Sequence, residues 1–189
     1  MKLYKKTLIL LACLILVVPT AQAARVAGVE IPDSLTAGGQ TLVLNGAGIR
    51  KKFFLKLYVG SLYLKQKNSN AQQIIEADEP MAVRLDIISG MITPKRMEQG
   101  ILEGFEASTN GRLGPLASRI DKFIDIFRAG IDKGDRFIMT YLPGKGTTVS
   151  QNGKITGQFE GLDFKQALFG IWLSRKPAQA SLKQAMLGG

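Results

Sequence analysis

The chain has 189 residues with 25 basic and 15 acidic side chains, no histidine and a single cysteine, Cys13. Because histidine is absent and Cys13 lies in a segment that we expect to be removed, nucleophile–histidine hydrolases and zinc or iron sites of histidine and cysteine are excluded. The net charge of +10 leaves three partner classes to consider, namely nucleic acid, anionic membrane surfaces and anionic small molecules.

The N-terminal residues 1–23 have the three parts of a secretory signal peptide. Three lysines precede the apolar run 7–18, and Ala21-Gln22-Ala23 fits the small-residue cleavage pattern. The apolar run is shorter than the roughly 20 residues of a membrane span. We therefore expect cleavage after Ala23 and an exported, periplasmic domain over 24–189, with a retained signal anchor as the alternative. Without its three signal lysines the chain keeps a net charge of about +7.

The first half of the mature chain is organised around the stretch 45–64. A first strand is predicted over 25–31, and 41–44 begins a second strand that leads into this stretch. Asn45 to Gly48 is a break of small residues, where the backbone can turn or approach another segment closely. The run 53–64 is rich enough in aromatic and aliphatic residues for a central strand.

A short helix and a strand follow this central stretch. Ser69 is the expected cap of a helix over 71–77, which ends before Pro80. The run 81–89 alternates as a strand does, with Val83, Leu85 and Ile87 on one face.

Two amphipathic helices come next. Thr93-Pro94 is a cap followed by a first-turn proline, and Asn110-Gly111 ends the helix that they begin. Pro115 begins the second helix and Gly130 ends it. Both carry apolar stripes at helical spacing, which are more often core than ligand contacts: Met97, Ile101 and Phe105 on the first, and Leu116, Ile120, Phe123, Ile124 and Phe127 on the second.

The last third is predicted to contain a strand (135–142), a turn (143–146), a hairpin of two strands (147–151 and 154–158) and two helices separated by Pro177. Asn152-Gly153 between the hairpin strands is the strongest turn signal of the chain. Asp163 is the expected cap of the penultimate helix. Strands and helices in this order predict an α+β fold in which a helical layer covers one face of a largely antiparallel sheet.

Other signals for chemistry are weak. The run 143–148, PGKGTT, lacks the spacing of a phosphate-binding loop, and a hairpin follows it where such a loop needs a helix. Glu76, Asp78 and Glu79 are more typical of a solvated helix end than of a metal site. The lysines are dispersed without interleaved aromatics, which argues against nucleic acid. We expect neither a metal nor a cofactor.

The stretch 50–58 mixes cations with aromatics on one strand parity, which includes Arg50, Lys56 and Tyr58. A guanidinium can bind a carboxylate through two parallel hydrogen bonds, and a phenol adds a third donor. Under the helical layer, the two groups would form the polar end of an apolar cavity. They can share one ligand only if the chain reverses near 49–52, because eight residues of unbroken strand span roughly 26 Å. The alternative is an exposed turn at Arg50 and a core tyrosine at Tyr58.

Three segments carry a resemblance to a known family. NGAGIRKKFFLKLYVGSLYL, YLPGKGTTVSQNGKITGQFEGLDF and ALFGIWLSRKP with the terminal LKQAMLGG resemble chalcone isomerases and their relatives, in the form of exported bacterial chalcone-isomerase-like proteins. The resemblance implies a long, curved antiparallel sheet with helices on one face and a ligand cleft between them.

The resemblance also implies roles for individual residues. Arg50 matches the family arginine that faces the ligand's negative oxygen, and Tyr58 stands where the plant enzymes have a threonine. The plant fatty-acid-binding relatives pair an arginine with a tyrosine, as this chain does. Polar groups of the enzymes fall near Thr93, Gly100 and Phe164, where this chain differs from them.

We therefore expect a non-catalytic binder of a fatty acid or similar carboxylate amphiphile, with no cofactor. The alternatives are an intramolecular lyase acting on a flavonoid-like or enone substrate, and a module whose basic surface contacts anionic membrane lipids. The oligomeric state stays open. The expected ligand-binding residues, with Arg50 as the one candidate for catalysis, are Arg50, Lys56, Tyr58, Thr93, Met97, Ile101, Phe105, Leu168 and Trp172.

Overall fold

The structure is a computed structural model that describes residues 24–189, so the predicted signal peptide lies outside the described residues. Its elements, in chain order, are β1 (Ala24–Val26), β2 (Val29–Ile31), β3 (Ser34–Ala37), β4 (Gln40–Lys52), β5 (Leu55–Leu64), α1 (Ala71–Glu76), β6 (Met81–Ile87), α2 (Pro94–Thr109), the 3-10 turn η1 (Gly114–Leu116), α3 (Ala117–Arg128), β7 (Arg136–Leu142), β8 (Gly146–Gln151), β9 (Lys154–Phe159), α4 (Leu162–Leu173) and α5 (Ala180–Met186).

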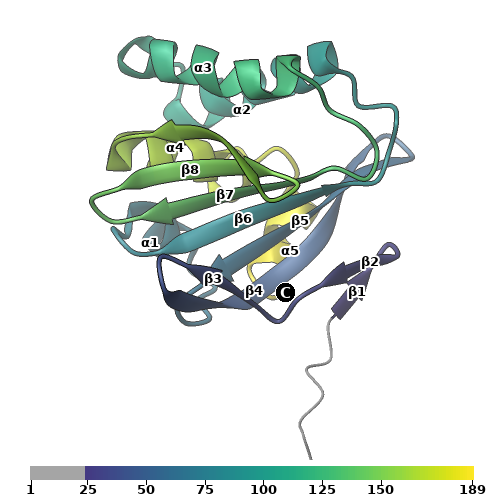
Figure 1. Ribbon diagram of the computed structural model, residues 1–189, viewed down its shortest axis with the longest axis horizontal. Coiled ribbons are helices and arrows are strands. Elements are labelled where there is room, and N and C mark those ends of the chain that lie inside the picture. The colour runs from purple at the N-terminus through teal and green to yellow at the C-terminus, as the bar shows by residue number, and fades with distance from the viewer. Residues whose placement is uncertain (1–23) are drawn as a thin grey trace, which may run out of the picture.

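Strands β3 to β9 form one antiparallel sheet in which each strand pairs with its neighbour in sequence (Figure 1). Strands β1 and β2 form a separate small ribbon. Successive residues of β5 enter different apolar clusters, because Tyr58 joins the larger cluster and Val59 the smaller one. Since neighbouring residues of a strand point to opposite faces, the two clusters lie on opposite faces of the sheet.

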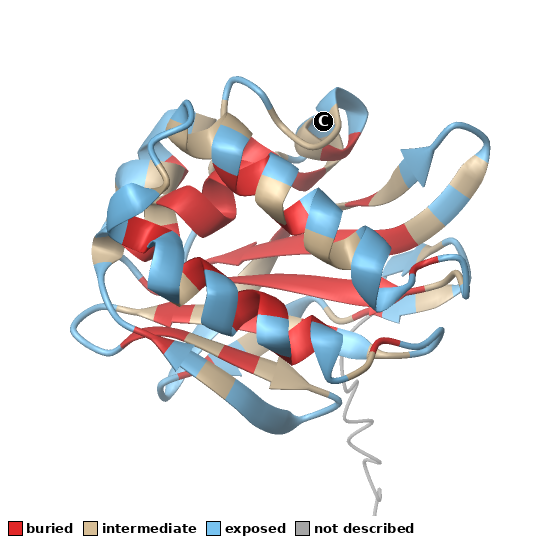
Figure 2. Cartoon of the chain, turned by 90° about the horizontal axis from the view of Figure 1, so that it is seen from above, coloured by how far each residue is buried: buried red, intermediate tan, exposed pale blue. Residues whose placement is uncertain are grey.

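All five α-helices contribute to the larger cluster, so the helical layer covers one face of the sheet. Figure 2 shows the helices lying across the strands, with buried residues toward the sheet and exposed residues away from it. The predicted α+β fold is confirmed. No helix between Ala24 and Gly189 is long and apolar enough to cross a membrane.

The prediction for the start of the chain needs two corrections. The expected single strand over 25–31 is two strands, because Ala27 and Gly28 both have positive φ and reverse the chain between them. The predicted break at 45–48 lies inside β4, which runs without a turn to Lys52. The chain reverses instead at Phe53 and Phe54, two residues that carry no turn signal.

The small residues of β4 allow a close approach, the other possibility that the sequence suggested. A Cβ atom on Gly46 would lie 2.1 Å from the carbonyl oxygen of Ala185, and one on Gly48 would lie 2.6 Å from the Ala185 Cβ. Asn45 Nδ2 donates to the Met186 carbonyl at 2.8 Å. Helix α5 is therefore packed directly on the backbone of β4.

Helix ends follow the predictions except at three N-termini. Pro115, the predicted start of the second amphipathic helix, lies in the 3-10 turn η1, and α3 begins at Ala117. Thr93 caps α2 and Asn110 ends it in a left-handed conformation, as expected. Asn70 caps α1 in place of Ser69, because the Asn70 side chain accepts from the Gln73 backbone N–H. Gly161 is the N-cap residue of α4, and the expected cap Asp163 lies in its first turn and binds Arg119.

Lys165 joins α4 to the end of α1. Its side chain is fully buried, and its ammonium group donates to the carbonyls of Ile74, Ile75 and Ala77 at 2.9, 2.8 and 2.6 Å. Burial lowers the pKa of Lys165 from 10.5 to about 8, although Asp78 and Glu79 act in the opposite direction. This ammonium group satisfies carbonyls that a helix end leaves without partners.

Candidate functional site

A cavity of about 580 Å³ lies between the helical layer and the sheet. Its walls come from the β4–β5 hairpin, the sheet strands β6 and β7, helices α2, α3 and α4, and the segment that joins α4 to α5. The volume is within the range of small-molecule sites in proteins.

The hairpin brings Arg50 and Tyr58 together. The two residues are direct partners across β4 and β5, because the chain reverses at Phe53 and Phe54. A register shift follows Arg50, whose next residue Lys51 pairs with Lys56. Leu57 is the extra residue of this bulge, so Leu57 and Tyr58 both line the cavity.

Arg50 is half-buried and only partly satisfied by the protein. Its Nη1 donates to the Lys51 carbonyl and, at 3.1 Å, to Gln179 Oε1. Gln179 Oε1 also accepts from the Lys51 backbone N–H at 2.7 Å, which fixes the amide beside the guanidinium. Between Ala24 and Gly189, no carboxylate forms an ion pair with Arg50, and its Nε and Nη2 have no hydrogen-bond acceptor. Three of its five N–H donors therefore remain for a ligand.

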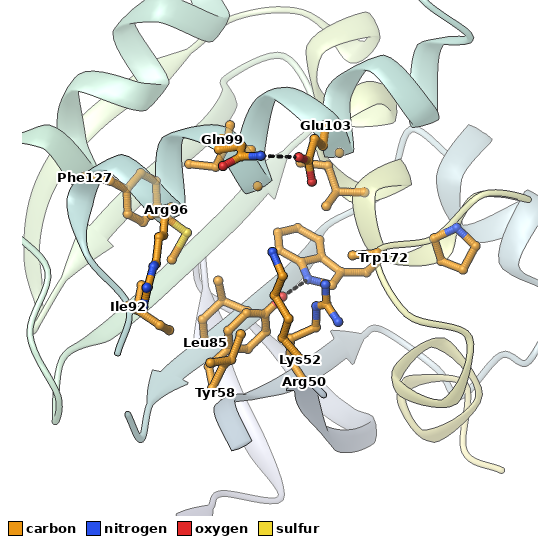
Figure 3. Close-up of a pocket in the computed structure, with 18 of the residues that line it drawn as sticks. Arg50, Lys52, Tyr58, Leu85, Ile92, Arg96, Gln99, Glu103, Phe127 and Trp172 are labelled. Atoms are coloured by element: carbon orange, nitrogen blue, oxygen red, sulfur yellow. Dashed lines mark hydrogen bonds between the residues drawn. The ribbon is translucent and has the colours of Figure 1, made fainter. Parts of the chain in front are cut away.

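Tyr58 forms the second polar group of the cavity. Trp172 Nε1 donates to the Tyr58 hydroxyl at 3.0 Å, across two side chains that are 5% and 9% exposed (Figure 3). The hydroxyl's own proton has no acceptor within residues 24–189. Burial raises the pKa of Tyr58 above its ordinary value of 10, although the Trp172 hydrogen bond and Arg50 act in the opposite direction. Tyr58 thus stays protonated at neutral pH and can donate.

Helix α2 presents one face to this cavity. Arg96, Gly100, Glu103 and Ala107 all line it at helical spacing, with Gly100 inside the stripe. A Cβ atom on Gly100 would have nothing within 4 Å, so this glycine leaves open space. One turn further, a Cβ on Gly104 would lie 2.8 Å from Ile171 on α4, which shows how closely the two helices approach.

The walls that the sheet and α3 contribute are apolar. Leu57 and Leu85 of the sheet contribute with Met139, and Phe123 and Phe127 of α3 contribute from the helical layer. Figure 3 shows Arg50 and Lys52 close to the Tyr58–Trp172 pair, with Phe127 across the cavity. The cavity therefore has a polar region at the hairpin, further polar side chains on α2, and hydrocarbon walls from the sheet and α3, which suits an amphiphile with an anionic group.

Five of the nine predicted site residues line the cavity, namely Arg50, Tyr58, Met97, Ile101 and Trp172. The other four lie elsewhere. Lys56 is exposed opposite Lys51, and the Thr93 hydroxyl accepts from the Arg96 backbone N–H at the start of α2. Phe105 and Leu168 are fully buried in the core. Phe105 packs against the rings of Phe123 and Phe164, with centroids 6.0 and 5.8 Å away.

Sequence reasoning missed several polar residues of the cavity, among them Lys52, Arg96, Gln99 and Glu103. Gln99 Nε2 donates to Glu103 Oε1 at 2.8 Å, as the dashed line in Figure 3 shows. The i, i+4 spacing of these two residues predicts their mutual contact. It does not reveal that this face of α2 looks into a cavity.

Comparisons with known proteins identify the family and the fold. Residues 23–188 match a family described as chalcone isomerase-like. The crystal structure of a fatty-acid binding protein of Arabidopsis thaliana superposes with a TM-score of 0.69 at 16% sequence identity, over 88% of this chain and 96% of that one. At this identity the likeness shows a shared fold. No curated protein gives a significant match. The predicted fold and the family resemblance are confirmed.

Proposed function

Because the chain belongs to the chalcone isomerase-like family, we propose that it binds a fatty acid or a similar carboxylate amphiphile in the cavity between the helices and the sheet. The observation that carries this proposal is Arg50, a half-buried guanidinium with three free donors at the edge of an apolar cavity. A carboxylate there accepts two hydrogen bonds from Arg50 and one from Tyr58, while its tail lies among Leu57, Met139 and Phe127. A protein of the same fold is named a fatty-acid binding protein, which supports this ligand class.

We test the proposal with protein purified under conditions that retain lipids. Native mass spectrometry should show a bound amphiphile, and the Arg50→Ala variant should lose it. The matched control is Lys154→Gln, which removes an exposed cation of the β8–β9 hairpin that is not part of the cavity lining. Empty wild-type protein that also fails to bind fluorescent fatty acids overturns the proposal.

Gly100 offers a second test that does not touch the polar groups. Gly100 is an exposed residue of the cavity lining, and a Cβ atom there would meet nothing within 4 Å, so a leucine has room to cover part of the cavity wall. Replacing a glycine inside a helix also raises helix propensity. Gly100→Leu should therefore fold at least as stably as wild type and bind fluorescent fatty acids more weakly. Unchanged binding by a folded Gly100→Leu variant would place the ligand outside this cavity.

We place an isomerase activity second. The Thr93 hydroxyl serves as a helix cap and Gly100 brings no side chain, so two positions near the enzymes' polar groups contribute none here. Stabilising the oxyanion that develops during chalcone cyclisation needs such donors. Loss of chalcone absorbance well above the spontaneous rate, abolished in Arg50→Ala, would reverse this order.

We also propose that the chain is exported after cleavage following Ala23, on the basis of the signal features of residues 1–23. Cell fractionation combined with intact-mass measurement tests this. A mass that includes residues 1–23 in the membrane fraction would favour the retained anchor.

A further inference from the structure

The tip of the β4–β5 hairpin exposes two large aromatic side chains. Phe53 is 88% exposed and Phe54 is 89% exposed. Met91, in the loop before α2, is 47% exposed. Phe53 and Met91 both belong to the lining of the cavity, so this apolar surface is continuous with the cavity's mouth. Figure 1 shows the hairpin projecting past the end of the neighbouring strands.

The two aromatics occupy a turn that does not favour them. Phe53 has φ of 55°, in the left-handed region where glycine or asparagine is usual. The β8–β9 hairpin meets the same demand with Asn152 and Gly153. A phenylalanine with positive φ and an almost fully exposed ring contributes little to the stability of this turn. A contact that buries the Phe53 ring must therefore come from outside the fold.

Cations surround these aromatics. Lys51, Lys52 and Lys56 are all exposed, and the segment 50–58 contains no acidic residue. Lys95 and Arg96 follow Met91 at the start of α2 and are exposed as well. Aromatic side chains ringed by lysine and arginine are typical of surfaces that enter the interface of an anionic bilayer.

Charge decides between a bilayer and a second copy of this chain. A symmetric dimer would set the same patch against itself and would bring the lysines of both copies together. Anionic headgroups neutralise these cations, while the phenylalanine rings leave water for the acyl boundary.

We propose that the tip, defined as residues 51–56 together with Met91, docks the protein onto the surface of a bilayer that contains anionic lipids. Phe53 and Phe54 insert between the headgroups, and the lysines contact lipid phosphates. The cavity mouth then faces the bilayer. This docking does not depend on which ligand the cavity binds.

The test uses flotation of the mature chain 24–189 with vesicles of phosphatidylcholine alone or mixed equally with phosphatidylglycerol. Binding should require phosphatidylglycerol and weaken as salt is raised. The double variant Phe53→Ser/Phe54→Ser should bind about tenfold more weakly or worse. Lys51→Gln/Lys56→Gln, which changes two lysines outside the cavity lining, should weaken binding about 30-fold.

Matched controls come from the β8–β9 hairpin. Ile155→Ser removes a side chain that is 68% exposed, and Lys154→Gln removes an adjacent cation. Both variants should bind vesicles like wild type. Phe53→Gly guards against a folding artefact, because glycine relieves the positive φ at this position; it should be as stable as wild type and still bind vesicles more weakly.

Three outcomes overturn the proposal. One is equal binding to vesicles with and without phosphatidylglycerol. Another is equal weakening by the tip variants and their β8–β9 controls. The third is a wild-type dimer in solution that becomes a monomer in Phe53→Ser/Phe54→Ser, which would assign the tip to self-association.

Discussion

Arg50 and Lys165 are two basic residues beneath the helices, and they differ in how many of their hydrogen-bond donors the fold satisfies. The ammonium of Lys165 is fully buried and donates to three carbonyls, which match its three N–H donors. The guanidinium of Arg50 is half-buried beside a cavity and keeps three donors without an acceptor within residues 24–189. A buried polar group that the fold satisfies is structural, whereas one that the fold positions and leaves open is suited to a ligand.

The largest expected effect is a loss of stability on replacing Lys165, the basic residue whose donors the fold satisfies. Lys165→Met keeps the volume of the side chain and leaves the carbonyls of Ile74, Ile75 and Ala77 without their donor. We expect the free energy of unfolding to fall by about 3 kcal/mol at pH 7. Urea denaturation measures it, and a loss below about 1 kcal/mol would show that the ammonium is not a structural centre.

The second largest effect is expected at Arg50, the basic residue that keeps free donors. Arg50→Gln removes the charged donors from the cavity but keeps a polar side chain that can still approach Gln179. Affinity for a fatty acid should fall by about 10-fold to 100-fold, corresponding to charge-assisted hydrogen bonds, while the urea midpoint changes little. Fluorescence titration and urea denaturation of the same sample separate the two. A large loss of stability with unchanged affinity would reverse the roles of Arg50 and Lys165.

A smaller effect is expected at Tyr58, whose hydroxyl accepts a hydrogen bond within the fold and also keeps a free donor. Tyr58→Phe leaves the Trp172 indole N–H without an acceptor and removes one donor from the cavity. We expect losses of about 1.5 kcal/mol in stability and about fivefold in affinity. If only the affinity changes, the Trp172 contact is dispensable for the fold.

The smallest effect is a pH dependence that only Lys165 should show. Its pKa is about 8 in the folded chain and 10.5 as its ordinary value, so the folded state binds fewer protons than the unfolded state between these values. The free energy of unfolding should therefore rise with pH as the folded chain loses this proton around pH 8, by less than about 1 kcal/mol over the window between pH 7.5 and 8.5. Urea denaturation in this window should show the rise in wild type and lose it in Lys165→Met. The same trend in both proteins would assign it to other groups.

The parts of the fold that were predictable from sequence are those with local signals. Thr93-Pro94 and Asn152-Gly153 each combine residues whose backbone preferences favour one structure, and both appear where expected. The turn at Phe53 and Phe54 carries no such preference, and the register of β4 against β5 could not be predicted without it. Trp172 and Tyr58 meet across 114 positions, a pairing that no local pattern indicates. Arg50 was predicted from the cations and aromatics on one strand parity and from the family resemblance, and neither signal indicates its Gln179 partner.

The packing of α5 on β4 determines the stage of folding at which Arg50 is held in position. Asn45 donates a hydrogen bond to the Met186 carbonyl, 141 positions later in the sequence. Gln179, just before α5, accepts a hydrogen bond from the Arg50 guanidinium beside the cavity. A chain that is still being synthesised and has formed its early strands lacks these two hydrogen bonds. Arg50 is therefore held in its place only after the final helix has docked, so the polar end of the cavity is complete only when the whole chain has folded.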